Sequence, residues 1–97
     1  MTSSPSACPQ LLLRLYVAGE SPNSAHARRN LAEVCKAYAL SERIELEIVD
    51  VLDDPLRMLS DAISVTPMLL RLAPSPVVRL VGDLSDRGLL LEVLGLP

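Results

Sequence analysis

The residues best suited to redox or metal chemistry are the two cysteines, Cys8 and Cys35. A disulfide-exchange enzyme needs a CxxC pair, and a zinc site needs closely spaced cysteines or histidines. The two cysteines here have neither spacing. Cys8 lies in a polar segment, and Cys35 falls on the apolar side of an expected helix. We interpret them as two unrelated thiols.

Candidates for acid–base catalysis are the single histidine, His26, and the adjacent carboxylates Asp53 and Asp54. No second ligand or catalytic partner is near His26 in the sequence, so we expect a solvated side chain. Asp53 and Asp54 directly precede Pro55, which is typical of a helix start with an acidic cap and proline in the first turn. We therefore expect a protein that is not an enzyme.

Two further carboxylates, Asp83 and Asp86, could be interpreted as metal ligands. Their spacing also fits a reciprocal capping box at the start of a helix, which needs no ion. The four glycines form neither a GxGxxG motif nor a phosphate-binding loop. The sequence therefore predicts no metal and no cofactor.

The composition indicates one aliphatic domain. The chain has 97 residues, of which 49% are hydrophobic, and it contains no Trp or Phe. A net charge of -3 with scattered basic residues disfavours nucleic-acid binding. Neither a transmembrane run nor a signal peptide is recognisable, so we expect a cytoplasmic protein with no membrane partner. The apolar surplus predicts an oligomer or a partner-binding face.

The first half of the chain has the pattern of a strand, a helix and a strand. Residues 1–10 are rich in Ser and Pro, and we expect a disordered arm before a single domain at 11–97. A strand is expected at Leu11–Ala18, and a helix at Ser24–Leu40 capped by Asn23 or Ser24. Ile44–Val51 alternates, with Ile44, Leu46 and Ile48 on the apolar face. The two strands should be parallel.

The second half is more ambiguous. We expect a helix from Pro55 that includes Ile63 and ends at Thr66-Pro67, since the residue before proline avoids helical geometry. Met68–Leu72 and Val77–Val81 should form a hairpin. A last helix, at 84–94, would be capped by Asp83, although the run 89–94 could also be a strand. The expected order is βαβ-αββα.

Several segments resemble the KaiB family in order and spacing. They are Leu15–Gly19, Pro22–Ser24, Val49–Leu52, Thr66–Pro67 and Gly82–Asp86, with Pro55, Pro74, Pro76 and Arg79 between them. The resemblance implies an α/β fold of the thioredoxin-like type, with an alternative packing of the second half in the order βαββααβ. Thioredoxin-type enzymes have CxxC after the first strand, whereas this chain has Gly19-Glu20-Ser21-Pro22. In such folds a cis proline often precedes the third strand, so Pro67 is either that residue or a trans helix stop.

The resemblance also implies a function. KaiB proteins are not enzymes: they bind KaiC, a circadian-clock ATPase, help to sequester KaiA, and switch between a binding fold and a stored homotetramer. We assign partner binding to Arg71 and Arg79, and the fold switch to Pro67, Gly82 and Asp83. A dimer is the alternative oligomer, and a stress or signalling protein without KaiC is the alternative function. The chain departs from clock KaiB sequences in having acidic residues at Asp53 and Asp54 and no basic residue at His26, Ala62 and Val78.

Overall fold

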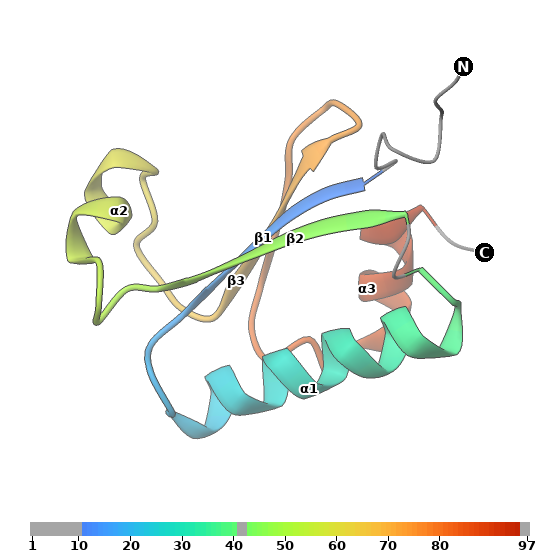
Figure 1. Ribbon diagram of the computed structural model, residues 1–97, viewed down its shortest axis with the longest axis horizontal. Helices are drawn as coiled ribbons and strands as arrows, with labels where there is room; N and C mark the ends of the chain where they lie inside the picture. The colour runs from blue at the N-terminus through green and yellow to red at the C-terminus, as the bar shows by residue number, and fades with distance from the viewer. Residues whose placement is uncertain (1–10, 41–42, 96–97) are drawn as a thin grey trace, which may run out of the picture.

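The computed structural model describes residues 11–40 and 43–95. The expected arm at 1–10, with Cys8, lies outside the described residues, as do the last two positions of the chain. The elements are, in chain order, β1 (Leu11–Val17), α1 (Pro22–Ala37), β2 (Ile44–Asp50), α2 (Pro55–Ser60), β3 (Met68–Ala73), β4 (Val78–Val81) and α3 (Arg87–Leu94). Their order and types confirm the predicted βαβ-αββα plan (Figure 1).

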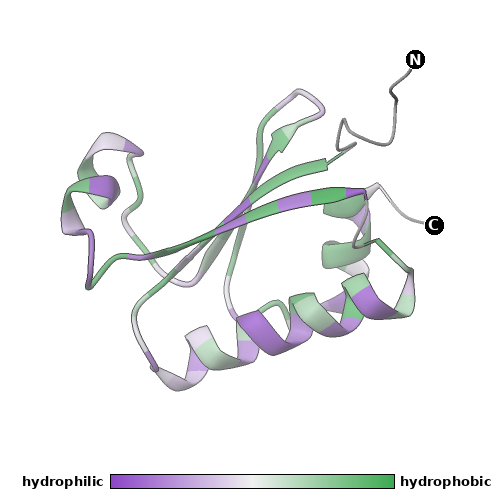
Figure 2. Cartoon of the chain, viewed as in Figure 1, coloured by the Kyte–Doolittle hydropathy of each residue, from purple (hydrophilic) through white to green (hydrophobic). Residues whose placement is uncertain are grey.

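The strands form one mixed sheet with the order β2-β1-β3-β4. β1 and β2 are parallel, as expected for a strand–helix–strand unit, and Leu15 lies opposite Ile48. β3 is antiparallel to both β1 and β4, which confirms the hairpin. In this sheet β1 is central, which explains why its sequence is almost continuously apolar. Hydrophilic and hydrophobic residues alternate along β2, which lies at the edge (Figure 2).

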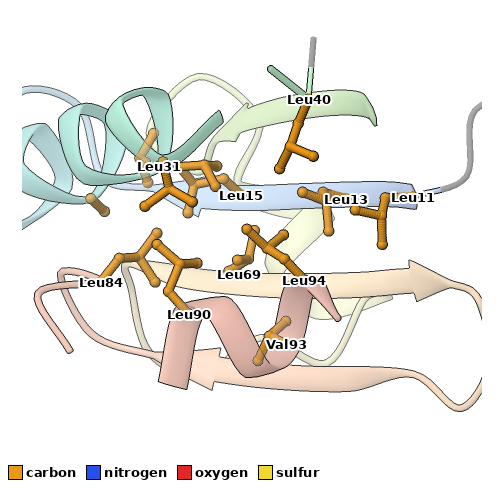
Figure 3. Packing of buried hydrophobic residues seen from close by; sticks show 13 residues of the cluster. Leu11, Leu13, Leu15, Leu31, Leu40, Leu69, Leu84, Leu90, Val93 and Leu94 are labelled. Carbon is orange, nitrogen blue, oxygen red and sulfur yellow. The ribbon is translucent and has the colours of Figure 1, made fainter. Parts of the chain in front are cut away.

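The two faces of the sheet carry separate apolar clusters. α1 and α3 lie on one face, where Leu31 of α1 and Leu90 of α3 pack with Leu15 and Leu69 of the sheet (Figure 3). These four side chains are almost completely buried. The other face carries a smaller cluster of buried residues, namely Tyr16, Val49, Val51, Ile63, Met68 and Leu70. α2 lies on this second side, away from α1 (Figure 1).

α1 begins and ends earlier than the predicted Ser24–Leu40. Ser21 is the cap and Pro22 follows it, because the fixed φ of proline suits the first turn of a helix. At the other end, Ala39 has φ 53, and Leu40 N–H donates to Cys35 O at 2.9 Å. This is a Schellman ending, which normally has glycine at the left-handed position. The apolar stripe therefore continues beyond the helix, because buried Leu40 follows the left-handed turn.

α2 ends at Ser60, so the prediction that it continues through Ile63 to Thr66 is wrong. Ala62 has φ 58, and Ile63 N–H donates to Met58 O at 2.8 Å. The ending is thus another Schellman motif, and Ile63 packs in the core from just beyond it. Asp54 is the cap residue as expected, but its side chain makes no capping hydrogen bond.

The last helix also needs a correction. Asp86, rather than Asp83, is its cap, and the Asp86 carboxylate accepts from Leu89 N–H at 3.1 Å. Asp83 instead accepts from Ser85 N–H at 3.0 Å within the preceding turn. The run 89–94 is helical and not a strand, because Leu90, Val93 and Leu94 bury one helical face against the sheet. The alternative packing βαββααβ is not the one found here.

Candidate functional site

Two serines, Ser21 and Ser24, lie at the start of α1. Ser21 is the cap and Ser24 lies in the first turn, so the pair has the CxxC spacing at the helix start. The Ser21 hydroxyl donates to Ser24 Oγ at 2.8 Å, and Ser24 Oγ accepts from Ala18 N–H at 3.0 Å. Ser24 is completely buried. The two hydroxyls fix the strand-to-helix turn, and neither can perform disulfide chemistry.

The other chemical candidates are dispersed. His26 is exposed on α1, and Asp53 and Asp54 are exposed before α2. Cys35 is free and partly buried, and burial raises the pKa of its thiol. In residues 11–40 and 43–95, no group of three or more side chains could hold a metal ion. The helices in these ranges are all too short or too polar to cross a membrane.

The structure does assemble one polar cluster, on the side of the sheet that α2 occupies. Arg14 of β1 donates to Glu47 of β2 at 2.7 Å and to the hydroxyl of Tyr16 at 3.3 Å. Arg57 of α2 contacts Glu47 at 3.3 Å and Asp61 at 3.2 Å. Tyr16 donates to Asp61. We call these five residues the α2 anchor.

Charges within the α2 anchor are mutually stabilised. The hydrogen bond from Tyr16 and the nearby guanidinium of Arg57 hold the pKa of Asp61 below its usual range. Arg57 and Arg14 lower the pKa of Glu47 in the same way. Burial and the adjacent Asp61 raise the pKa of Tyr16. The hydroxyl therefore stays protonated and both carboxylates stay ionised near neutral pH.

Sequence reasoning missed the α2 anchor because its members are distant in the chain. The contact between Tyr16 and Asp61 spans 45 positions. The only local signal was the i, i+4 spacing of Arg57 and Asp61, which suits an ion pair on a helix. That spacing could not show that the pair faces the sheet.

Exposed leucines lie on α2 and in the turn before it. The fractional exposures of Leu52, Leu56 and Leu59 are 69%, 73% and 80%. Asp53 and Asp54, also exposed, adjoin these leucines in the chain. Grouped exposed leucines are typical of a protein-binding surface, because their hydration is unfavourable until a partner covers them. We call Leu52, Leu56 and Leu59 the leucine surface.

The edge strand β2 exposes a second set of apolar residues. Leu46 and Ile48 are 38% and 46% exposed, so only Ile44 of the expected apolar face packs against the main cluster. Within the described residues β2 pairs with β1 alone, and its outer edge presents free backbone groups. An extended segment of another protein could pair with such an edge.

Arg71 and Arg79, the predicted partner-binding residues, lie on opposite faces of the sheet. Arg71 is paired with Val78, which packs against the main cluster, and it donates to Val93 O of α3 at 2.8 Å. Arg79 is paired with Leu70 of the second cluster and donates to Ala62 O at 3.4 Å. The two arginines therefore cannot form one patch, and Arg79 is the one near α2.

The residues assigned to a fold switch are brought close together. The Thr66–Pro67 peptide bond is cis. Gly82 N–H donates to Pro67 O at 3.0 Å, and Gly82 has φ 117, which a side chain would disfavour. The carbonyl of the next residue, Asp83, accepts from Asn30 of α1 at 2.8 Å. The start of β3 and the turn after β4 are thus joined to each other and to α1.

Comparison with known sequences places the chain in a family. The profile of the KaiB domain matches residues 14–96. The circadian clock protein KaiB3 of Synechocystis is 38% identical over 77 residues, covering 79% of this chain and 74% of the relative. The circadian clock oscillator protein KaiB of a Synechococcus species is 42% identical over 76 residues, covering 78% and 68%. These relatives are named as clock proteins and not as enzymes.

Comparison with solved structures identifies the fold. The N-terminal domain of Synechococcus elongatus SasA superposes with a TM-score of 0.71 and 29% identity, covering 98% of this chain and 93% of that domain. Mitochondrial thioredoxin 3 of Saccharomyces cerevisiae gives 0.70 at 13% identity, covering 94% and 83%, which shows a shared fold alone. The fold is therefore thioredoxin-like, and the chain belongs to the KaiB family of circadian clock proteins.

Proposed function

We propose that this protein is a non-catalytic clock regulator that binds a KaiC-type ATPase through the leucine surface. The observation that carries the proposal is the exposure of Leu52, Leu56 and Leu59, each at least 69% exposed. The buried core of a protein interface is more apolar than the rest of the surface, so exposed leucines suit its centre. Membership of the KaiB family supports the choice of partner.

The charge around the leucine surface indicates what kind of partner surface would fit it. Asp53 and Asp54 are exposed beside Leu52 and Leu56. A partner surface should therefore be apolar at its centre and basic at its rim, because charge complementarity selects the partner and speeds association. Arg79 remains a proposed partner-binding residue, supported by its contact with Ala62 directly after α2. Arg71 would bind a partner on the opposite face of the sheet, beside α3.

Storage as a homo-oligomer is part of the same proposal, with a tetramer favoured over a dimer. A chain that exposes the leucine surface and the apolar residues of β2 gains stability by covering them. A rearrangement of the second half would allow this, and Pro67, Gly82 and Asp83 are the proposed switch residues.

A KaiA-like protein is the proposed second partner, for which the β2 edge offers a pairing surface. A cytoplasmic location belongs to this proposal.

Binding measurements with KaiC-type proteins from the same genome, in both nucleotide states, test the proposal. Replacing Leu56 and Leu59 by glutamine keeps good helix formers and should weaken binding at least tenfold, since a hot-spot residue contributes about 2 kcal/mol. The control is Val77→Gln, since Val77 is 55% exposed in the turn between β3 and β4. Absence of binding by the wild-type chain to every KaiC-type protein would overturn the proposal and favour the clock-independent alternative.

A further inference from the structure

Burial of its own residues is too small to hold α2 in place. It has six residues and none is buried. Isolated helices of this length do not persist in water, because nucleation is costly and few hydrogen bonds follow it. Its apolar contact with the second cluster comes from the half-buried Met58 and from Ile63 just beyond the helix. Polar contacts must therefore contribute to its position.

Polar contacts reach this segment from three strands. Arg14 of β1 contacts Asp61 at 3.5 Å, and Glu47 of β2 contacts Arg57 at 3.3 Å. Arg79 of β4 donates to Ala62 O at 3.4 Å. Tyr16 adds a hydrogen bond to Asp61 from a completely buried side chain. The segment 57–62 is thus connected across the width of the sheet.

These connections lie on the side of α2 opposite its leucines. Arg57 and Asp61 are four positions apart and share one helical face, whereas Leu56 and Leu59 share another. Arg57 and Asp61 have side-chain exposures of 29% and 21%, while Leu56 and Leu59 are 73% and 80% exposed. The same contacts that attach the helix therefore also fix its rotation, with leucines outward.

We propose that the α2 anchor is a latch that holds α2 on the sheet and keeps the leucine surface facing outward. The hydrophobic effect favours the opposite rotation, in which leucines would turn toward the sheet. Arg14, Tyr16, Glu47, Arg57 and Asp61 oppose that rotation because each would lose a charged partner. The latch deepens the proposed function, since it regulates access to the proposed KaiC-binding surface.

Hydrogen exchange on the isolated chain tests the latch without a partner. The reporters are the amides of Asp61, Ala62 and Ile63, which donate to carbonyls of α2. Glu47→Gln removes a charge that pairs with both arginines, and its matched control is Glu45→Gln on the same exposed strand. We expect exchange about threefold faster in Glu47→Gln, as for a partly exposed ion pair. Equal rates in the two variants would overturn the latch.

The salt dependence of amide exchange is a second test of the latch. At about 1 M salt the Debye length falls to about 3 Å, so exposed ion pairs are largely screened. Exchange at residues 61–63 of the wild-type chain should accelerate with salt, and Glu45→Gln should respond equally. Glu47→Gln should respond less because part of its latch is already absent. A salt response equal in all three proteins would contradict the proposal.

A binding experiment connects the latch to the partner surface. If the wild-type chain binds a KaiC-type protein, Glu47→Gln should bind it more weakly than Glu45→Gln does, to the extent that the anchored state, which presents the leucine surface, loses population. Unchanged affinity would show that the latch does not control access. If the wild-type chain binds none, the proposed function fails, and the exchange rates alone decide on the latch.

Discussion

The hydroxyl of Tyr16 donates a hydrogen bond to the carboxylate of Asp61, which follows it by 45 positions. Tyr16 is completely buried in the central strand, whereas Asp61 lies at the surface directly after α2. A hydrogen bond to an ionised group in a poorly hydrated position is stronger than one between neutral groups. This bond therefore joins the sheet to the only helix on its second side, among the elements described.

Replacing Tyr16 by phenylalanine should destabilise the chain while leaving the core filled. Removing a hydrogen bond to a charged group costs about 1.5–3 kcal/mol. The loss should appear as a lower urea midpoint with unchanged slope. Tyr38→Phe is the matched control, because Tyr38 is 38% exposed at the end of α1. A similar loss in both variants would show that removing any tyrosine hydroxyl has this effect, and would not support a special role for the bond to Asp61.

Stability should fall in acid through the carboxylates of the α2 anchor. Glu47 and Asp61 have pKa values lowered in the folded state, so the unfolded state binds more protons. Their contribution is present above the unfolded pKa, near 4, and is lost as pH falls through the lower folded pKa. The free energy of unfolding of Glu47→Gln should decrease less than that of the wild type between about pH 5 and pH 3.

Glu45→Gln again serves as the control in this titration. It removes a carboxylate from the same strand but leaves both arginine contacts of Glu47 in place. Its pH profile should parallel that of the wild type. If Glu47→Gln also parallels the wild type, the ion pairs of the α2 anchor contribute nothing to acid sensitivity.

The serine pair at the start of α1 should accept a disulfide. Its hydroxyl oxygens are 2.8 Å apart, so cysteines at 21 and 24 would need little backbone movement to form an S–S bond. Ser21→Cys combined with Ser24→Cys, in a background without Cys8 and Cys35, should lose two hydrogens on oxidation, as measured by mass spectrometry. The Ser21→Cys single variant should show no intramolecular loss. A double variant that keeps both thiols under oxidant would show that positions 21 and 24 are not placed for a disulfide.

Truncating one buried and one exposed leucine should change the free energy of unfolding by very different amounts. Leu31 is 1% exposed between α1 and the sheet, and Leu31→Ala should cost about 2–5 kcal/mol through lost burial and a cavity. Leu59 is 80% exposed, and Leu59→Ala should change stability by less than about 0.5 kcal/mol. Chemical denaturation measures both. A large loss for Leu59→Ala would show that the leucine is buried in solution.

The strand and helix order could be predicted because each pattern is local. β1 is an apolar run interrupted only by Arg14, and Pro55 marks a helix start. The helix ends could not, because Ala39 and Ala62 occupy left-handed positions where glycine is the usual signal. The apolar alternation of β2 was also misleading, because it does not distinguish a central strand from an edge strand.

The candidate site was less accessible from the sequence than the fold. The exposure of Leu56 and Leu59 contradicts their ordinary interpretation as a core stripe, because the contacts of Arg57 and Asp61 turn the other side of α2 toward the sheet. The α2 anchor depends on β1, β2 and α2 meeting, which no local spacing can show. By contrast, the segments in register, Gly82–Asp86 among them, identified the family correctly, although the capping role assigned to Asp83 belongs to Asp86.

The acidic pattern of β2 has a consequence for solubility. Glu45 and Glu47 are exposed along an unpaired sheet edge, and the strand has no basic residue. Arg14 and Arg57 compensate the charge of Glu47, so in two copies that met edge to edge it is Glu45 that would supply the repulsion opposing cross-β growth of the kind that leads to fibrils. Leu46 and Ile48 can therefore stay exposed without making the protein aggregate near neutral pH, and protonation in acid would remove this protection.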